Sequence, residues 1–261
     1  MLVDSHCHLD FDVFDDDRAA VLERAVAAGV GAAVTICTRL TRFETVLALA
    51  QSSPRLYCSV GIHPHQVAEE GVADPARLIA LAGHPKVVGI GETGLDYFYD
   101  KSPRPDQQAG FRAHIHAARA TGLPLIVHTR DADDDTVAIL AEEYADGPFP
   151  GVIHCFTAGR QLAEKALEIG FYISLSGIVT FRNSEDLRAV VRDIPIDRIL
   201  VETDSPFLAP IPNRGKRNEP AFVVHTASAV ARLKGMETHA FVDTTTRNFQ
   251  ALFGKAVLPA P

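Results

Sequence analysis

Eight short apolar segments recur along the chain at intervals of about 20 to 37 residues, close to the length of one βα unit. Most are continuous apolar runs, which are typical of parallel strands covered by helices. Eight such units predict an α/β fold, a single (β/α)8 TIM barrel over residues 1–261 with its functional site at the C-terminal ends of the strands. The expected strands are residues 2–6, 31–37, 56–62, 87–92, 124–129, 151–156, 171–176 and 198–203.

The stretches between these segments have helical patterns. Residues 18–26 and 132–144 show the apolar spacing of amphipathic helices. Gly29, Gly122 and Gly170 each follow a helical pattern and precede a strand, the position that glycine prefers at a helix C-terminus. A doubly wound open sheet is the alternative for the same alternation. No linker or low-complexity segment divides the chain, so we expect one domain.

Composition limits the functional classes. A net charge of −8 gives no support to broad, non-specific binding of nucleic acid, so a polyanionic substrate would need local cations. The four cysteines stand singly, without a Cys-x-x-Cys pair, which indicates reduced thiols. No apolar run approaches the roughly 18 residues of a spanning helix, and the first residues lack a secretory pattern. We therefore expect a cytoplasmic monomer with no membrane partner.

Metal-capable side chains stand at the ends of several expected strands. His6 and His8 end the first segment, and residues two apart on a strand project to the same side. Further candidates follow later apolar runs directly: His63, Glu92, His128, His154 and Asp204. The C-terminal ends of barrel strands meet at one face, so these side chains should converge. Any one of them could be a packed core histidine, but together they predict a metal site.

The ligand types favour a catalytic site. Imidazole and carboxylate suit Zn, Mn, Fe, Co or Ni, and thiolate ligands, which are common in structural zinc sites, are absent from the set. The set is large enough for two ions that share one carboxylate, an arrangement that clamps a phosphoryl centre between ions about 3.5–4 Å apart. The same geometry would serve a hydrolase of amides or lactones, so the metal site alone does not identify the substrate.

A series of ordered blocks resembles the TatD family of metal-dependent deoxyribonucleases, within the amidohydrolase-like barrels. The resemblance covers nearly the whole chain, and Ala158 and Phe207 are small departures from its usual pattern. The blocks are DSHCHLD at 4–10, GIHPH at 61–65, GIGETGLDY at 89–97, HTRDA at 128–132, HCFT at 154–157, SGIVTF at 176–181, ETDSPFLAP at 202–210 and RGKRNEP at 214–220.

The resemblance implies a two-metal hydrolase of DNA phosphodiesters, a 3′→5′ exonuclease that acts on single strands. It places two divalent ions (Mg, Mn, Zn, Ni or Fe) on one shared bridge, Glu92. The remaining ligands fall into two groups: His6, His8 and Asp204 for one ion, and His128 and His154 for the other. Asp204 would accept the proton of the attacking water, and His63 would contact a phosphate oxygen or protonate the departing oxygen.

Local cations are the expected substrate contacts. The loop 212–220 is the most basic stretch of an acidic chain and follows Asp204 closely, so it should lie over the same mouth of the barrel. A solvated turn is the alternative interpretation of such a run. The residues expected to contact DNA are Arg214, Lys216 and Arg217 in this loop, together with Arg130, Arg182 and His65.

Two other functions remain open at this point. The first is another amidohydrolase-type reaction, on a lactone, a phosphotriester or a cyclic amide. Many enzymes of that class bridge their metals with a carboxylated lysine, whereas the fourth strand here ends in Glu92 and has Lys86 at its start. The second is a non-enzymatic, metal-binding barrel. His114 and His116 lie two apart in a helical pattern and do not share a face, so we expect packing or surface roles for them.

Overall fold

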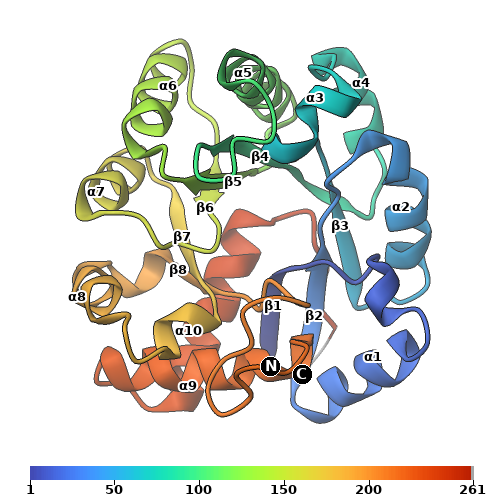
Figure 1. Ribbon diagram of the computed structural model, residues 1–261. Coiled ribbons are helices and arrows are strands. Elements are labelled where there is room, and N and C mark those ends of the chain that lie inside the picture. Colours follow the sequence, from blue (N-terminus) through green and yellow to red (C-terminus); the bar gives the residue numbers. More distant parts are fainter. Residues whose placement is uncertain (260–261) are drawn as a thin grey trace.

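The computed structural model describes residues 1–259 and forms one eight-stranded parallel sheet, with helices around its outside (Figure 1). Neighbouring strands follow the order β1-β2-β3-β4-β5-β6-β7-β8. This sequential order confirms the TIM barrel, and the doubly wound alternative is wrong because its strand order reverses within the sheet. The strands are β1 (Leu2–Cys7), β2 (Val30–Thr35), β3 (Leu56–Val60), β4 (Val87–Asp96), β5 (Leu125–Arg130), β6 (Gly151–Ile153), β7 (Tyr172–Leu175) and β8 (Ile199–Val201).

The barrel closes between the ends of β8 and β1. Cys7 and Ser205 form an isolated parallel bridge there. The amide of Asp204 donates to the carbonyl of His6 at 2.9 Å, and the amide of His8 donates to Ser205 at 2.7 Å. These bonds tie three expected metal-site residues together through the backbone.

Helices follow the strands where the apolar spacing predicts them. The expected helices at 18–26 and 132–144 correspond to α1 and α6, and Gly122 has a left-handed φ of 69° just after α5. The α-helices are α1 (Arg18–Ala27), α2 (Phe43–Gln51), α3 (Val67–Glu70), α4 (Pro75–Ala82), α5 (Arg104–Thr121), α6 (Asp133–Ala145), α7 (Arg160–Glu168), α8 (Glu185–Asp193), α9 (Val223–Leu233) and α10 (Thr238–Leu252). Short 3-10 turns are η1 (Asp12–Phe14), η2 (Leu40–Arg42), η3 (Pro64–Gln66), η4 (Gly177–Thr180), η5 (Ile196–Arg198) and η6 (Pro220–Phe222).

Within residues 1–259, none of the helices combines the length and the hydropathy needed to cross a bilayer.

The interior of the barrel is a packed apolar core whose lower end is covered by α10, drawn in red behind the strands in Figure 1. Phe249 and Phe253 are almost completely buried against side chains that point inward from the strands, including Ile126, Val152 and Leu200. Burying each aromatic ring contributes roughly 1.5–3 kcal/mol. Because the lower end is filled, the polar side chains collect at the mouth formed by the C-terminal strand ends.

His114 fixes α5 against the loop that follows β3. Its imidazole is fully buried, with Nδ1 donating to the Gly110 carbonyl at 2.7 Å and Nε2 accepting from the Ile62 amide at 3.0 Å. Both ring nitrogens of the neutral imidazole therefore have a hydrogen-bond partner. Burial lowers the pKa of His114 to about 4. The expected packing role is confirmed, while His116 is exposed on the same helix.

We predict that His114 makes stability depend on pH. Its pKa falls from 6.5 in the unfolded chain to about 4 in the folded one. The unfolded state therefore binds more protons, and stability falls as the pH drops from 6.5 to 4, by up to about 3 kcal/mol. Other histidines titrate in the same range, so the test compares urea unfolding of the wild type and His114→Gln at pH 7.5 and pH 4.5. The wild type should lose more stability than the variant, and equal losses would contradict this role.

Candidate metal centre

Strand periodicity brings the polar side chains to the mouth of the barrel. Ile126, Val152 and Leu200 face the interior core of the barrel. Residues two positions further along share that inward face, and they are His128, His154 and Glu202. His154 and Glu202 are buried and His128 is partly buried, so the three side chains meet above the apolar layer.

Glu92, near the middle of β4, lies between two groups of imidazoles. Its side chain is 3% exposed. One oxygen, Oε2, is 3.5 Å from His6 Nε2, whereas Oε1 is 2.7 Å from His154 Nε2 and 3.0 Å from His128 Nδ1. Burial by itself raises the pKa of Glu92, but the nearby imidazoles, His154 first, outweigh it and hold the pKa well below its ordinary value. Glu92 is therefore an ionised carboxylate that faces both groups.

The first group contains His6, His8 and Asp204. The two Nε2 atoms are 3.3 Å apart, and Asp204 Oδ1 is 3.6 Å from His6 Nε2 and 3.3 Å from His8 Nε2. Ligands around a tetrahedral ion with bonds of about 2.0–2.1 Å are spaced by roughly this distance. Burial raises the pKa of Asp204, but its bond to His8 and the imidazole charges lower it further, so this carboxylate is ionised.

Hydrogen bonds on the outer ring nitrogens orient the second group. His128 Nε2 donates to Asp96 Oδ2 at 3.1 Å, and His154 Nδ1 donates to Glu202 Oε1 at 3.3 Å. These bonds fix which ring nitrogen faces Glu92, Nδ1 of His128 and Nε2 of His154. Burial lowers the pKa of both rings, but the neighbouring carboxylates outweigh it and raise the pKa above its ordinary value. Metal-binding histidines are typically held by carboxylates in this way. Asp96 also accepts from His65 Nε2 at 2.7 Å, so His65 shares its partner with His128.

His63 has the opposite arrangement. Its Nδ1 accepts from the His65 amide at 3.1 Å and caps η3. The neutral ring therefore carries its proton on Nε2, which points at Glu92 Oε1 over 3.4 Å. Burial lowers the pKa of His63 to about 4, which keeps the ring neutral. His63 belongs to a group with Glu92 and His128 that could hold an ion, but its hydrogen bonds make it a donor toward the centre.

The donor set fits divalent cations. Two groups of His and Glu side chains that share Glu92 are close enough to hold an ion. His6, His8 and Glu92 form a buried group, whereas His63 and His128 in the other group with Glu92 are partly buried. The outer Nδ1 atoms of His6 and His8 are buried without a hydrogen-bond partner. The inner Nε2 atoms of the two rings are 3.3 Å apart, so one N–H can donate to the other ring, or both lone pairs can bind one cation. Nitrogen and carboxylate ligands of this kind are the ones that divalent transition metals prefer.

Glu202 is a site residue that the sequence analysis missed. It is 0% exposed, and its Oε1 also accepts from the Cys155 amide at 2.7 Å. The signal was present in the sequence, because Glu202 stands two residues before Asp204 at the end of the eighth apolar run. His154, His6 and Glu202 also form a third possible cation group.

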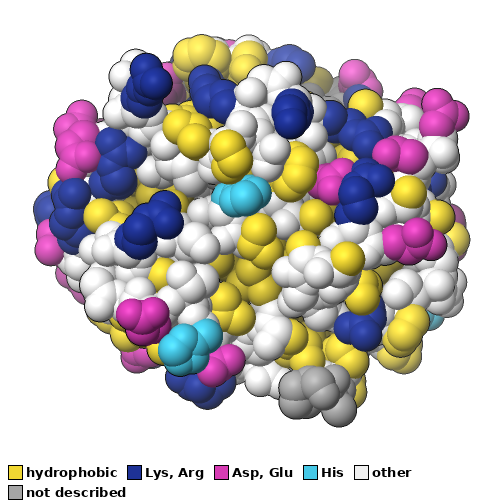
Figure 2. Space-filling model, turned by 90° about the horizontal axis from the view of Figure 1, so that it is seen from below, with side chains coloured by type: hydrophobic (Ala, Val, Ile, Leu, Met, Phe, Trp, Pro, Cys, Tyr) yellow, Lys and Arg dark blue, Asp and Glu magenta, His cyan; other side chains and the backbone are white. Residues whose placement is uncertain are grey.

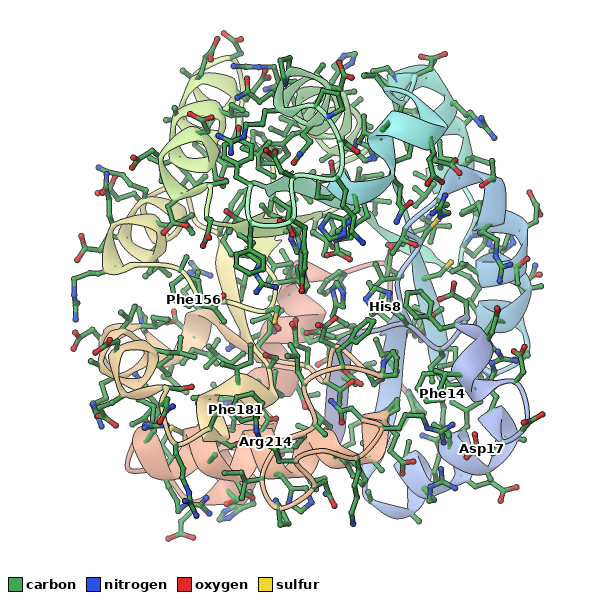
Figure 3. All side chains as sticks on the ribbon, viewed as in Figure 1. His8, Phe14, Asp17, Phe156, Phe181 and Arg214 are labelled. Carbon is green, nitrogen blue, oxygen red and sulfur yellow. The ribbon has the colours of Figure 1, made fainter. Side chains whose placement is uncertain are left out.

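The expected DNA contacts lie in different surroundings. Arg217 donates to Asp17 Oδ2 and to the Val13 carbonyl, both at 2.6 Å, so its guanidinium is already engaged. The guanidinium of Arg214 lies 3.6 Å from the centre of the Phe181 ring, away from His8 in Figure 3. Their roles as substrate contacts stay predictions.

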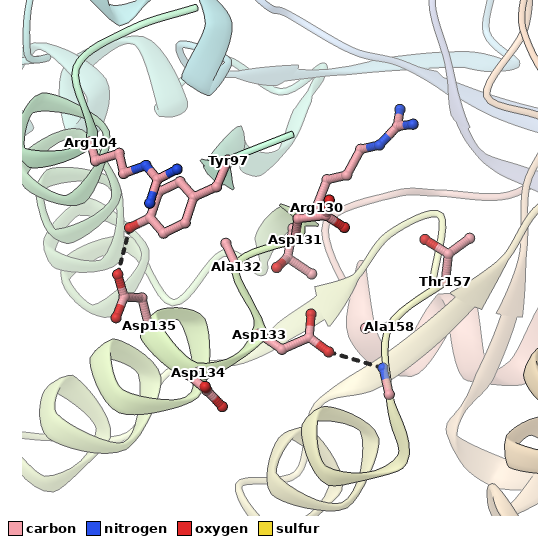
Figure 4. A pocket seen from close by; sticks show the side chains of 12 residues that line it. Tyr97, Arg104, Arg130, Asp131, Ala132, Asp133, Asp134, Asp135, Thr157 and Ala158 are labelled. Atoms are coloured by element: carbon pink, nitrogen blue, oxygen red, sulfur yellow. Dashed lines mark hydrogen bonds between the residues drawn. The ribbon is translucent and has the colours of Figure 1, made fainter. Parts of the chain in front are cut away.

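The side chains of Lys216 and Arg182 are exposed, as is that of Arg214. Lys and Arg side chains gather in the upper half of the face over α9 and α1 (Figure 2). Arg130 extends from the end of β5 and points away from Asp133 and Asp135, which begin α6 (Figure 4). The geometry therefore leaves these cations accessible to phosphate groups, although their role is a prediction as well.

Comparisons with known proteins agree with this architecture. A family model described as TatD-related DNase matches residues 3–254. The uncharacterized metal-dependent hydrolase YcfH of Escherichia coli is 46% identical over 97% of this chain and 95% of its own length. The 3′-5′ ssDNA/RNA exonuclease TatD of Enterobacter lignolyticus is 36% identical over 94% and 95%, respectively. The crystal structure of YjjV, a TatD homolog from Escherichia coli, superimposes with a TM-score of 0.88 at 28% identity and covers 97% of this chain and 98% of its own.

A TIM barrel with imidazoles and carboxylates at its mouth, together with relatives named as metal-dependent hydrolases, places the chain in the class of metal-dependent hydrolases. The match over nearly the whole chain specifies the family: the chain belongs to the TatD-related DNases. The resemblance to the TatD family is thus confirmed. The expectation that the protein is a metal-dependent hydrolase of ester bonds is confirmed as well.

We predict that Glu202 tunes metal affinity through His154. Replacing Glu202 by Gln keeps the size of the side chain but removes the charge that orients the imidazole. Loss of such a partner typically weakens metal binding by about 10–100-fold. Titration of metal-stripped protein with Mn²⁺ or Zn²⁺ measures the change. Glu23→Gln, an exposed carboxylate on α1, is the matched control. An unchanged affinity in Glu202→Gln would remove Glu202 from the site.

Proposed function

We propose that this protein is a cytoplasmic, monomeric phosphodiesterase that degrades single-stranded DNA from its 3′ end with two divalent ions. One ion would be held by His6, His8 and Asp204, the other by His128 and His154, with Glu92 shared between them. The named exonuclease among the relatives supports the substrate class.

The observation that carries this proposal is that Glu92 lies between two groups of imidazoles. Its two oxygens face different imidazole groups, at 3.5 Å from His6 and 2.7 Å from His154. A single ion needs one such group, whereas two ions that share a carboxylate need both. Bound divalent cations polarise a phosphodiester and acidify water, which is the chemistry that this hydrolysis requires.

Asp204 is the best-placed proton acceptor. Its carboxylate is ionised, as its lowered pKa indicates, and its side chain is 14% exposed, more than that of Glu92. It can therefore orient a water molecule at the mouth and take its proton. His63 offers an Nε2–H group, because its other nitrogen is occupied by the His65 amide. That group can donate to a phosphate oxygen of the substrate.

The lysine-bridged chemistry of other amidohydrolase-type enzymes has no support in this geometry. Lys86 lies just before β4, at the opposite end of the strand from Asp96. Its Nζ donates to the carbonyls of Ser53 and Leu56, each at 2.8 Å. Lys86 is thus a structural residue at the lower end of the barrel.

We predict metal-dependent release of mononucleotides from single-stranded DNA. Metal-stripped protein should be inactive, and Mg²⁺, Mn²⁺ or Zn²⁺ should restore cleavage. Glu92→Ala removes the shared ligand and Asp204→Asn removes the proton acceptor, so each should lower kcat/KM by more than about 100-fold. The product length, measured on 3′-labelled and 5′-labelled strands, reports the direction of degradation.

Glu23→Ala and Asp243→Asn are the matched controls, since both carboxylates are exposed on helices outside the mouth. They should keep wild-type activity. If no metal restores cleavage of DNA or RNA by the wild type, the nucleic-acid assignment is wrong. A screen of lactones and cyclic amides on the same preparation would then identify the ester or amide that is hydrolysed.

A further inference from the structure

Three large aromatic side chains are exposed at the mouth of the barrel. Phe98, Tyr99 and Phe207 are 53%, 52% and 50% exposed, and they are the aromatic members of the large exposed hydrophobic side chains within residues 1–259. Phe98 and Tyr99 follow β4, and Phe207 follows β8. A half-exposed ring forgoes about half of the roughly 1.5–3 kcal/mol that full burial contributes, so three such rings at one end of the barrel point to a ligand that covers them.

Phe207 lies next to the metal site, at the ends of β1 and β8. Its ring centre is 6.3 Å from that of His8 and 6.0 Å from that of Phe11, and Phe11 stacks on His8 at 4.8 Å. Phe11 and Phe207 line a pocket of about 740 Å³ that also contains Arg39 and Arg42. The pocket is also lined by Asp10 and Asp12. Arg39 pairs with Glu69, and Arg42 lies 3.7 Å from Asp12. An apolar ring surface therefore adjoins one imidazole of the metal site, with arginines and carboxylates at its edge.

Tyr99 occupies the corresponding position on the side of β3 and β4. Its ring centre is 5.3 Å from that of His65, and Phe98 meets it edge-on at 4.9 Å. The guanidinium of Arg130 lies 4.0 Å from the Phe98 ring centre and 4.8 Å from that of Tyr99, while Lys101 Nζ lies 5.6 Å from Tyr99. This second surface also combines exposed rings with positive charge.

The two surfaces lie across the mouth from each other, because β4 and β8 are four strands apart in an eight-stranded barrel with sequential order. We propose that Tyr99 with Phe98, and Phe207 with Phe11, are stacking surfaces for unpaired nucleobases on either side of the phosphate that is hydrolysed at Glu92. This inference rests on the proposed function and adds the reason why a single strand is the substrate.

Stacking explains the choice of a single strand. Every base presents a π-face, but in a duplex those faces are covered by neighbouring base pairs. Base–aromatic stacking contributes about 1–3 kcal/mol per base and tolerates any sequence. Arg130 and Lys101, beside Phe98 and Tyr99, attract a flanking phosphate, which a chain with a net charge of −8 needs locally. The two surfaces thus complement the bases and the backbone of one unpaired strand.

The test compares two substrates of equal length, a single-stranded oligonucleotide and the same backbone with every base removed. The wild type should have a higher kcat/KM on the strand with bases. Phe207→Leu and Tyr99→Leu keep apolar volume but remove the π-face, and each should lower the ratio of the two kcat/KM values by about 5- to 150-fold. Phe207→Tyr and Tyr99→Phe keep a ring and should keep the ratio. Val26→Ala, an exposed apolar residue on α1, controls for lost surface area.

Four results would overturn the inference. Equal kcat/KM of the wild type on the two strands would exclude stacking. So would a loss of kcat/KM in the Leu variants that is the same on both strands. In either case, metal-dependent cleavage would still support the proposed function. Loss of a concentration-dependent dimer in the Leu variants, with the ratio unchanged, would assign the rings to contact between two copies of the chain. Failure of the metal-loaded wild type to cleave either strand would overturn the proposed function as well.

Discussion

The buried carboxylate of Glu92 is the constraint on which the site depends. A carboxylate removed from water is costly unless positive charge lies close to it. Here each of its oxygens faces imidazoles from other strands, including His6 from β1 and His154 from the end of β6. The arrangement requires a closed barrel, because strand ends that are distant in sequence must reach the same carboxylate. The backbone bond from Asp204 to His6 completes that closure at the site itself.

Hydrogen bonds on the ring nitrogens that point away from Glu92 then orient the imidazoles differently. Asp96 and Glu202 each accept a hydrogen bond from the outer nitrogen of a histidine, so the inner nitrogen of that ring faces Glu92. The backbone amide of His65 instead donates to Nδ1 of His63, so the Nε2 of that ring faces Glu92. The second hydrogen-bond partner of each ring therefore sets which nitrogen it presents to Glu92. The core beneath them, closed by α10, fills the lower end of the barrel, so these groups lie at the opposite end, at the mouth.

Much of this architecture could be predicted from the sequence, because apolar runs mark buried parallel strands and polar residues mark their ends. The convergence of His128, His154 and Asp204 was expected from their positions after apolar runs. Glu92 converges with them from the middle of β4, because that strand continues to Asp96 and does not end at Glu92 as expected. What depends on contacts between distant segments could not be predicted. The pairing of Arg217 with Asp17 joins residues 200 positions apart and occupies an expected DNA contact. The role of Glu202 required knowing which face of β8 points inward, and Asp96 required knowing that two histidines meet on it.

The most direct test of the account is electron paramagnetic resonance of metal-stripped protein loaded with Mn²⁺. Two ions that share the Glu92 carboxylate are magnetically coupled, so the wild type should show a coupled spectrum at two equivalents per chain. Glu92→Ala should show isolated ions or bind fewer of them. A wild type that binds one ion, or two without coupling, would contradict the shared carboxylate. A coupled pair that persists in Glu92→Ala would contradict it equally.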